Sequence, residues 1–117
     1  MALILVVDDE LIVRNIVEMA LKFEGHQVMV APDANRATHL CAGHKFDLVT
    51  TDLNMPGMDG LALCRVIKTN KPDLPILMIA SSPSDPLLAD AFLRKPFSFN
   101  ELIKAVNSLL KNSKKTT

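Results

Sequence analysis

The sequence predicts an α/β domain built on a five-stranded parallel sheet. Short apolar runs that are continuous rather than alternating recur along the chain, which is typical of strands buried on both faces. Segments with a helical spacing of apolar residues separate most of these runs, and strands that alternate with helices form βαβ units. The 117 residues suffice for one core of this kind, so we expect a single domain over 1–117 with a basic tail at 111–117.

The predicted strands and helices follow one another in chain order. Strands are expected at Leu3–Val7, Gln27–Ala31, Phe46–Thr51, Pro75–Ala80 and Phe92–Arg94. Helices are expected at Leu11–Phe23, Ala34–Ala42, Leu61–Thr69 and from the capping box of Ser98 and Glu101 to about Leu110. In the first helix, one apolar side is formed by Ile12, Ile16, Met19, Ala20 and Phe23.

The connection between the last two strands breaks this alternation. Only Ser81–Ala91 lies there, with Pro83 and Pro86 in it, whereas a parallel crossover usually needs a dozen or more residues, mostly helix. We therefore expect the fourth of the five helices to be missing or vestigial.

Composition favours a cytoplasmic protein that binds neither nucleic acid nor membrane. Thirteen basic residues balance thirteen acidic ones, which does not support a nucleic-acid-binding domain. Cys41 and Cys64 have no metal-binding spacing, and buried reduced thiols fit a reducing cytoplasm. No stretch has the pattern of a signal peptide or the length to span a membrane.

Charged residues follow three of the predicted strands. The acidic run Asp8-Asp9-Glu10 follows the first, Asp52 follows the third and Lys95 follows the fifth. Carboxyl ends of parallel strands share one edge of the sheet, where such folds bind ligands. Each residue alone has an ordinary alternative, a helix cap for Asp8 or Asp9, a loop acid for Asp52 and a surface lysine for Lys95. Their coincidence predicts a Mg²⁺-dependent phosphoryl site, since clustered carboxylates bind hard cations.

The motifs around these residues resemble the receiver domain of bacterial two-component response regulators. The resemblance is carried by Val6–Glu10, Thr51–Gly60 and Lys95–Phe97, and it covers nearly the whole chain. It implies the CheY-like, or flavodoxin-like, strand order 2-1-3-4-5.

The resemblance also implies a role for each site residue. Asp52 is the phosphoacceptor, and Asp9, Asp52 and the backbone carbonyl of Asn54 bind Mg²⁺, with Asp8 acting through water. Lys95 contacts the phosphoryl group. A histidine kinase or a histidine phosphotransfer protein is the expected donor, and a downstream protein target is the expected receiver of the signal. The oligomeric state stays open.

Two features depart from the family pattern. Ala80 stands where the family usually has a Thr or Ser, so the switch hydroxyl is lost unless Ser81 replaces it. The segment Ser81–Ala91 is about seven residues shorter than the family usually has between the switch position and the lysine. Phe92 falls at the position of the family's switch aromatic. The Lys95–Pro96 bond is typically cis in the family. These departures favour phosphoacceptor chemistry with non-standard switching.

Two other functions stay open from the sequence. The first is a non-phosphorylated pseudo-receiver that acts as a protein-interaction module, which Ala80 and the short segment favour. The second is a Mg²⁺-dependent aspartyl phosphatase, which is disfavoured because Asn54 stands where haloacid-dehalogenase-like enzymes carry a second Asp. We therefore expect a signalling phosphoacceptor that is not an enzyme in the ordinary sense.

Overall fold

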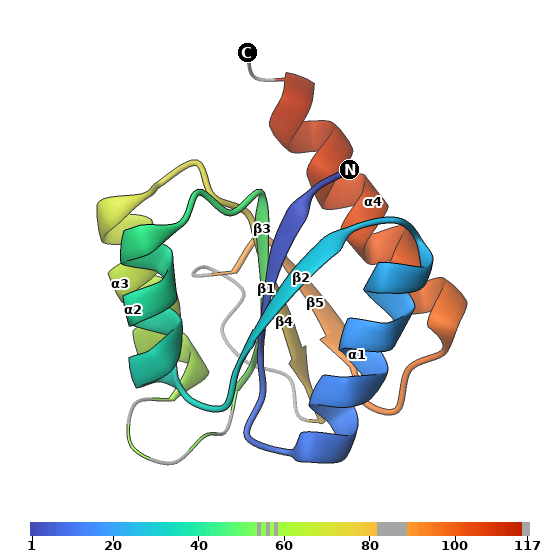
Figure 1. The fold of residues 1–117 in the computed structure, drawn as a ribbon, viewed down its shortest axis with the longest axis horizontal. Helices are drawn as coiled ribbons and strands as arrows, with labels where there is room; N and C mark the ends of the chain where they lie inside the picture. Colours follow the sequence, from blue (N-terminus) through green and yellow to red (C-terminus); the bar gives the residue numbers. More distant parts are fainter. Residues whose placement is uncertain (54, 56, 58, 82–88, 116–117) are drawn as a thin grey trace.

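A single five-stranded sheet runs through the middle of the domain (Figure 1). The computed structural model describes residues 1–53, 55, 57, 59–81 and 89–115. All neighbouring strands are parallel, and their order is β2-β1-β3-β4-β5, which confirms the predicted fold. The strands are β1 (Leu3–Val7), β2 (Gln27–Ala31), β3 (Leu48–Asp52), β4 (Ile76–Ala80) and β5 (Ala91–Arg94).

Four helices in the described residues cover the two faces of the sheet. They are α1 (Leu11–Phe23), α2 (Ala34–Gly43), α3 (Gly60–Asn70) and α4 (Phe99–Lys115). Figure 1 shows α2 and α3 on one face and α1 and α4 on the other. Most boundaries lie within one or two residues of the expected ones. However, α4 continues to Lys115, well into the stretch that we expected to be a tail.

Side-chain caps explain where three of the helices begin. Asp33 accepts a hydrogen bond from the backbone N–H of Arg36 at the start of α2, and Asp59 accepts one from Ala62 at the start of α3. Ser98 and Glu101 form the predicted reciprocal capping box, with bonds of 2.9 and 3.1 Å. These caps satisfy backbone donors that would otherwise lack a partner at each helix end.

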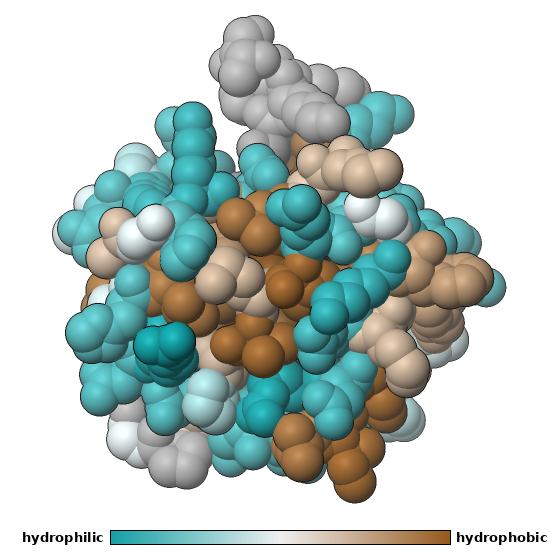
Figure 2. Space-filling view, in the orientation of Figure 1, coloured by the Kyte–Doolittle hydropathy of each residue, from teal (hydrophilic) through white to brown (hydrophobic). Residues whose placement is uncertain are grey.

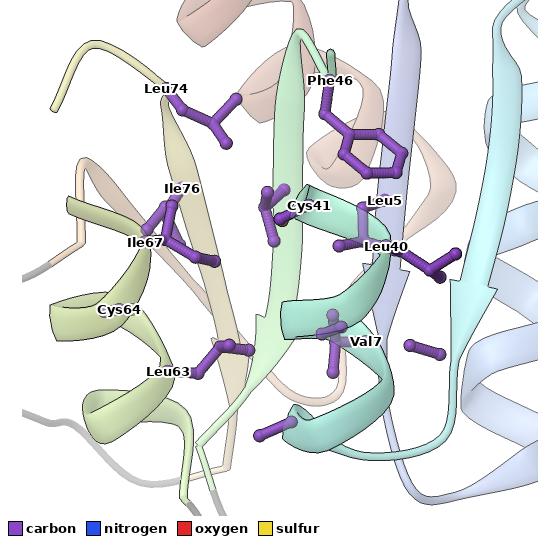
Figure 3. Packing of buried hydrophobic residues seen from close by; sticks show 14 of the residues in the cluster. Leu5, Val7, Leu40, Cys41, Phe46, Leu63, Cys64, Ile67, Leu74 and Ile76 are labelled. Carbon is purple, nitrogen blue, oxygen red and sulfur yellow. The ribbon is translucent and has the colours of Figure 1, made fainter. Parts of the chain in front are cut away.

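The hydrophobic core has one layer on each face of the sheet. Alternate residues of β1 point to opposite layers, so Leu5 and Val7 pack with α2 and α3 while Ile4 and Val6 pack with α1 and α4. Figure 3 shows the first layer, in which Leu63 and Ile67 of α3 and Leu40 of α2 reach toward the sheet. Burial on both faces explains why the central strands are continuously apolar.

The apolar side identified in α1 lies mostly in solvent. Ile12, Ile16, Met19 and Phe23 are all exposed, and of that set only Ala20 is buried. The helix packs on the sheet through a second apolar stripe, whose buried members are Val17, Ala20 and Leu21. Spacing identified the helix correctly, but α1 carries two apolar stripes and the sheet covers only one of them.

Asp90 fixes the end of the connection from β4 to β5 against the first residue of β4. Its carboxylate accepts the backbone N–H of Ile76 at 2.7 Å and lies 2.7 Å from the ammonium of Lys68. The backbone N–H of Asp90 in turn donates to the carbonyl of Ile76. The prediction that a helix is missing or vestigial here concerns mainly residues 82–88, which lie outside the described part of the chain.

Candidate functional site

Acidic residues from two strands and a lysine from a third meet at the carboxyl edge of the sheet. Asp52 is the last residue of β3, Asp8 follows β1 and Lys95 follows β5. The strands β1 and β3 are neighbours, with Val7 paired to Thr51, so Asp8 and Asp52 emerge side by side. Both aspartates are buried, with exposed fractions of 4 and 5 %.

The ammonium group of Lys95 joins the acidic residues. Its Nζ lies 3.5 Å from Asp8 Oδ2, 3.5 Å from Asp52 Oδ1 and 3.3 Å from Glu10 Oε1. One carboxylate oxygen from each of these three residues lies within 4.8 Å of the others. A cluster of this kind is compact enough to surround one cation.

Backbone hydrogen bonds fix the two buried aspartates. Asp8 Oδ1 accepts the N–H of Glu10 at 2.9 Å, and Asp52 Oδ1 accepts the N–H of Leu53 at 2.8 Å. The guanidinium of Arg14 donates to the carbonyl of Asp8 at 3.0 Å, which ties α1 to the end of β1. Asp8 therefore orders the turn before α1, while Glu10 occupies the cap position without a side-chain capping bond.

Burial raises the free energy of the ionised forms of Asp8 and Asp52. It raises the pKa of Asp8, although the Glu10 N–H and the charge of Lys95 oppose the effect. Burial also raises the pKa of Asp52 against the attraction of Lys95 and the Leu53 N–H, and repulsion from Asp9 adds to the rise. For Lys95, burial favours the neutral amine, but attraction by Asp8 and Asp52 outweighs it and raises the pKa of the ammonium group.

The acidic cluster differs in one respect from the set implied by the resemblance. Asp9 is exposed and its carboxylate is not among the three within 4.8 Å, although its charge acts on Asp52. Glu10 is in the cluster instead. The sequence places Glu10 in the acidic run after the first strand but indicates no site role for it, because nothing in the sequence fixes the direction of its flexible side chain. Asn54 lies outside the described residues.

The switch positions lie around Lys95. Ala80 is fully buried, and its carbonyl accepts the backbone N–H of Lys95 at 2.9 Å. Ser81 is exposed and lines a hollow of about 350 Å³ together with Lys95. Phe92 is 37 % exposed on β5, and the Lys95–Pro96 peptide bond is cis.

A close approach of backbones sets the distance between α3 and the acidic cluster. The N–H of Gly60 donates to the carbonyl of Leu53 at 2.7 Å. A Cβ added at Gly60 would overlap the carbonyl oxygen of Asp52 and lie 2.8 Å from the Cα of Leu53. Gly60 and the capping residue Asp59 therefore have the structural roles expected for a loop that leads from a strand end into a helix.

Residues 4–107 match the family model of the response regulator receiver domain. The chain belongs to this family. Receiver domains in general are signalling phosphoacceptors of two-component response regulators.

Individual relatives agree with this assignment. The receiver domain is 38 % identical over 117 aligned residues to the response regulator MprA of Mycolicibacterium vanbaalenii, covering 94 % of this chain and 51 % of that protein. The chain thus spans about half the length of the curated relatives that it matches. None of the helices described here is long and apolar enough to cross a membrane.

Solved structures share the fold. The receiver domain superposes on response regulator TrrA of Thermotoga maritima, in complex with Mg²⁺ and BeF, with a TM-score of 0.88 and 33 % identity over 93 % of this chain and 99 % of that one. A CheY-like receiver domain of Methanospirillum hungatei gives a TM-score of 0.95 at 24 % identity, covering 100 and 99 % of the two chains. The second likeness concerns the fold alone.

Proposed function

We propose that this receiver domain accepts a phosphoryl group on Asp52 in a Mg²⁺-dependent reaction, with a histidine kinase or a histidine phosphotransfer protein as donor. The observation that carries the proposal is the cluster of Asp8, Glu10 and Asp52 around the single ammonium of Lys95. The Mg²⁺–BeF complex of the relative TrrA adds support.

The donor atoms at the sheet edge fit a hard divalent cation. Carboxylate oxygens are the ligands that Mg²⁺ prefers, and it typically uses one or two of them together with waters and phosphate oxygens. Burial raises the pKa values of Asp8 and Asp52, and the attraction of Lys95 offsets this rise only in part. We propose that Asp9, Asp52 and the carbonyl of Asn54 hold the ion, with Asp8 contributing through water. When bound, the ion supplies charge neutralisation for an incoming phosphoryl group.

Asp52 and Lys95 have separate roles in the proposed transfer. A carboxylate oxygen of Asp52 attacks the phosphorus atom, an acyl phosphate bond forms, and the bond from phosphorus to the donor imidazole nitrogen breaks. Lys95, already held at the edge by the acids, donates to a phosphoryl oxygen. Burial of Asp52 keeps bulk water from the new bond.

The response to phosphorylation is proposed to be non-standard. Ala80 has no hydroxyl with which to follow the phosphoryl group, and its backbone is already bonded to Lys95. Ser81 lines the same hollow as Lys95 and is the nearest substitute on the chain. Phe92 is partly exposed, and we propose that a signal to a downstream protein uses a route other than the usual hydroxyl and aromatic pair.

Intact-mass measurement after incubation with acetyl phosphate tests the proposal. Wild type with Mg²⁺ is expected to gain one phosphoryl group, and omission of Mg²⁺ or the change Asp52→Asn is expected to abolish the gain. Asp59→Asn is the matched control, because it removes an acid from the same loop and keeps a capping side chain. An equal gain in Asp52→Asn would contradict the proposal.

A further inference from the structure

Three carboxylates share the N–H donors of one ammonium group at the sheet edge. Lys95 Nζ lies 3.3 Å from Glu10 Oε1 and 3.5 Å from both Asp8 Oδ2 and Asp52 Oδ1. An ammonium group has three N–H donors, so these three acids can occupy all of them. A phosphoryl oxygen attached at Asp52 must therefore replace one of the acids before Lys95 can donate to it.

Two of these acids are held by the backbone around them. Asp8 Oδ1 accepts the N–H of Glu10, and Asp52 Oδ1 accepts the N–H of Leu53. Their side chains are only 5 and 7 % exposed, so neither can turn into water without leaving its backbone donor unpaired. Asp52 is also the residue that carries the phosphoryl group in the proposed reaction. Neither acid is therefore suited to leave Lys95.

Glu10 differs from both because its carboxylate is free to leave. Its side chain is 60 % exposed and, within the part of the chain that the structure describes, makes its hydrogen bond and ion pair with Lys95 alone. Glu10 occupies the N-cap position of α1 without a side-chain capping bond, so its rotation breaks no bond of the helix. Figure 2 shows hydrophilic surface at the lower edge of the view, where the turn from β1 to α1 lies in Figure 1, so water is available to the released carboxylate.

We infer that Glu10 is a positioning residue for Lys95, which it holds beside Asp8 and Asp52 while Asp52 is unphosphorylated and releases to the phosphoryl group on phosphorylation. The inference rests on the proposed function, which supplies the second partner of Lys95. Any state in which Lys95 has turned to a phosphoryl oxygen has lost the contact with Glu10. The carboxylate of Glu10 therefore stabilises the unphosphorylated site and weakens its affinity for a phosphoryl group.

Beryllium fluoride, a stand-in for a phosphoryl group on a carboxylate, tests the release of Lys95. The titration is made in Mg²⁺ and followed by fluorine NMR. Glu10→Gln keeps the length of the side chain and removes its charge. It is expected to bind beryllium fluoride about two- to fivefold more tightly than wild type, the factor that an ion pair with one exposed partner contributes. If wild type binds and Glu10→Gln binds equally or more weakly, the inference is overturned and the phosphoacceptor function of Asp52 stands.

Two further variants separate the contact from the charge. Glu10→Asp keeps the charge but withdraws the carboxylate by one methylene group, so it should bind beryllium fluoride as tightly as Glu10→Gln. Wild-type affinity in Glu10→Asp would show that Glu10 acts by repelling the anion at a distance, which overturns the inference. Glu24→Gln is the matched control, because it removes an exposed acid at the other end of α1, and it should bind like wild type. Binding by Glu24→Gln as tight as that of Glu10→Gln overturns the inference as well, and circular dichroism checks that all variants fold.

Chemical labelling tests the holding of Lys95 without a metal or a phosphoryl analogue. Acetic anhydride in trace amounts acetylates amines, and peptide mass spectrometry compares the labelling of Lys95 with that of the exposed Lys104 as an internal reference. Glu10→Gln and Glu10→Asp are expected to raise the relative labelling of Lys95 by about two- to fivefold, and unchanged labelling overturns the inference. If wild type binds no beryllium fluoride while both variants raise the labelling, the proposed function fails together with the release step, and the hold of Glu10 on Lys95 stands.

Discussion

Lys95 carries one positive charge and lies within 3.5 Å of three carboxylates. Two of them, on Asp8 and Asp52, are buried, and burial raises the pKa of both. Three carboxylates thus share one ammonium group, which leaves an excess of negative groups over positive ones at this edge. This excess is a physical reason for the site to bind a cation and then an anionic group beside it.

The raised pKa of Asp52 sets the sign of a stability effect. A carboxyl whose pKa is higher in the folded than in the unfolded protein contributes stability below its unfolded value of 3.8 and loses that contribution as pH rises through the folded value. Asp52→Asn removes the penalty, so the metal-free variant should melt at a higher temperature than wild type at neutral pH, with the difference shrinking toward pH 4.

Thermal melts in a chelator across this pH range measure the effect. Mg²⁺ at neutral pH should raise the melting temperature of wild type more than that of Asp52→Asn. A metal-free Asp52→Asn protein that is less stable than wild type at neutral pH would show that Lys95 more than offsets the burial of Asp52.

At the scale of elements, the position of α3 depends on a glycine. The N-terminus of α3 lies against the end of β3, and the backbone of Asp52 occupies the space that a side chain at Gly60 would need. The acidic cluster and the start of α3 are thus built as one unit.

Gly60→Ala is expected to destabilise the domain by about 1–3 kcal/mol, because the added Cβ forces the two backbones apart. Gly43→Ala is the matched control at the end of α2. A Cβ there meets nothing within 4 Å, so it should be neutral or stabilise by about 0.4–1 kcal/mol. Urea denaturation gives both values, and equal stability of the two variants would contradict the close approach at Gly60.

Asp90 holds the amino end of β4 through one hydrogen bond and one ion pair. Asp90→Ala leaves the Ile76 N–H without this acceptor and should cost about 1–3 kcal/mol. Asp90→Asn keeps an acceptor oxygen and loses only the partly exposed ion pair with Lys68, so its cost should stay below about 1 kcal/mol. If urea denaturation gives the same loss for both, the ion pair and not the hydrogen bond stabilises this connection.

Sequence patterns predicted the elements better than their orientation. The run that ends at Asp52 located β3 because burial on both faces requires continuous apolar residues. In α1 the same kind of argument identified the helix but selected Ile12, Ile16, Met19 and Phe23, which are exposed. Two apolar stripes on one helix are equivalent in the sequence, and only packing against the sheet distinguishes them.

At the scale of the whole molecule, strand order brings the site together. Asp8, Asp52 and Lys95 are far apart in the sequence and follow different strands, and the order β2-β1-β3-β4-β5 places all three at one edge. That edge was predictable because parallel strands end on the same side. The participation of Glu10 in the cluster was not predictable, since a long exposed side chain takes its direction from tertiary contacts.

The central claim is that Asp52 accepts the phosphoryl group, and chemical trapping locates the acceptor directly. Borohydride reduces an aspartyl phosphate to homoserine, which peptide mass spectrometry assigns to a position. After incubation with acetyl phosphate and Mg²⁺, homoserine is expected at position 52 and absent in a sample without Mg²⁺. Homoserine at position 8, 9 or 59, or at no position, would contradict the claim.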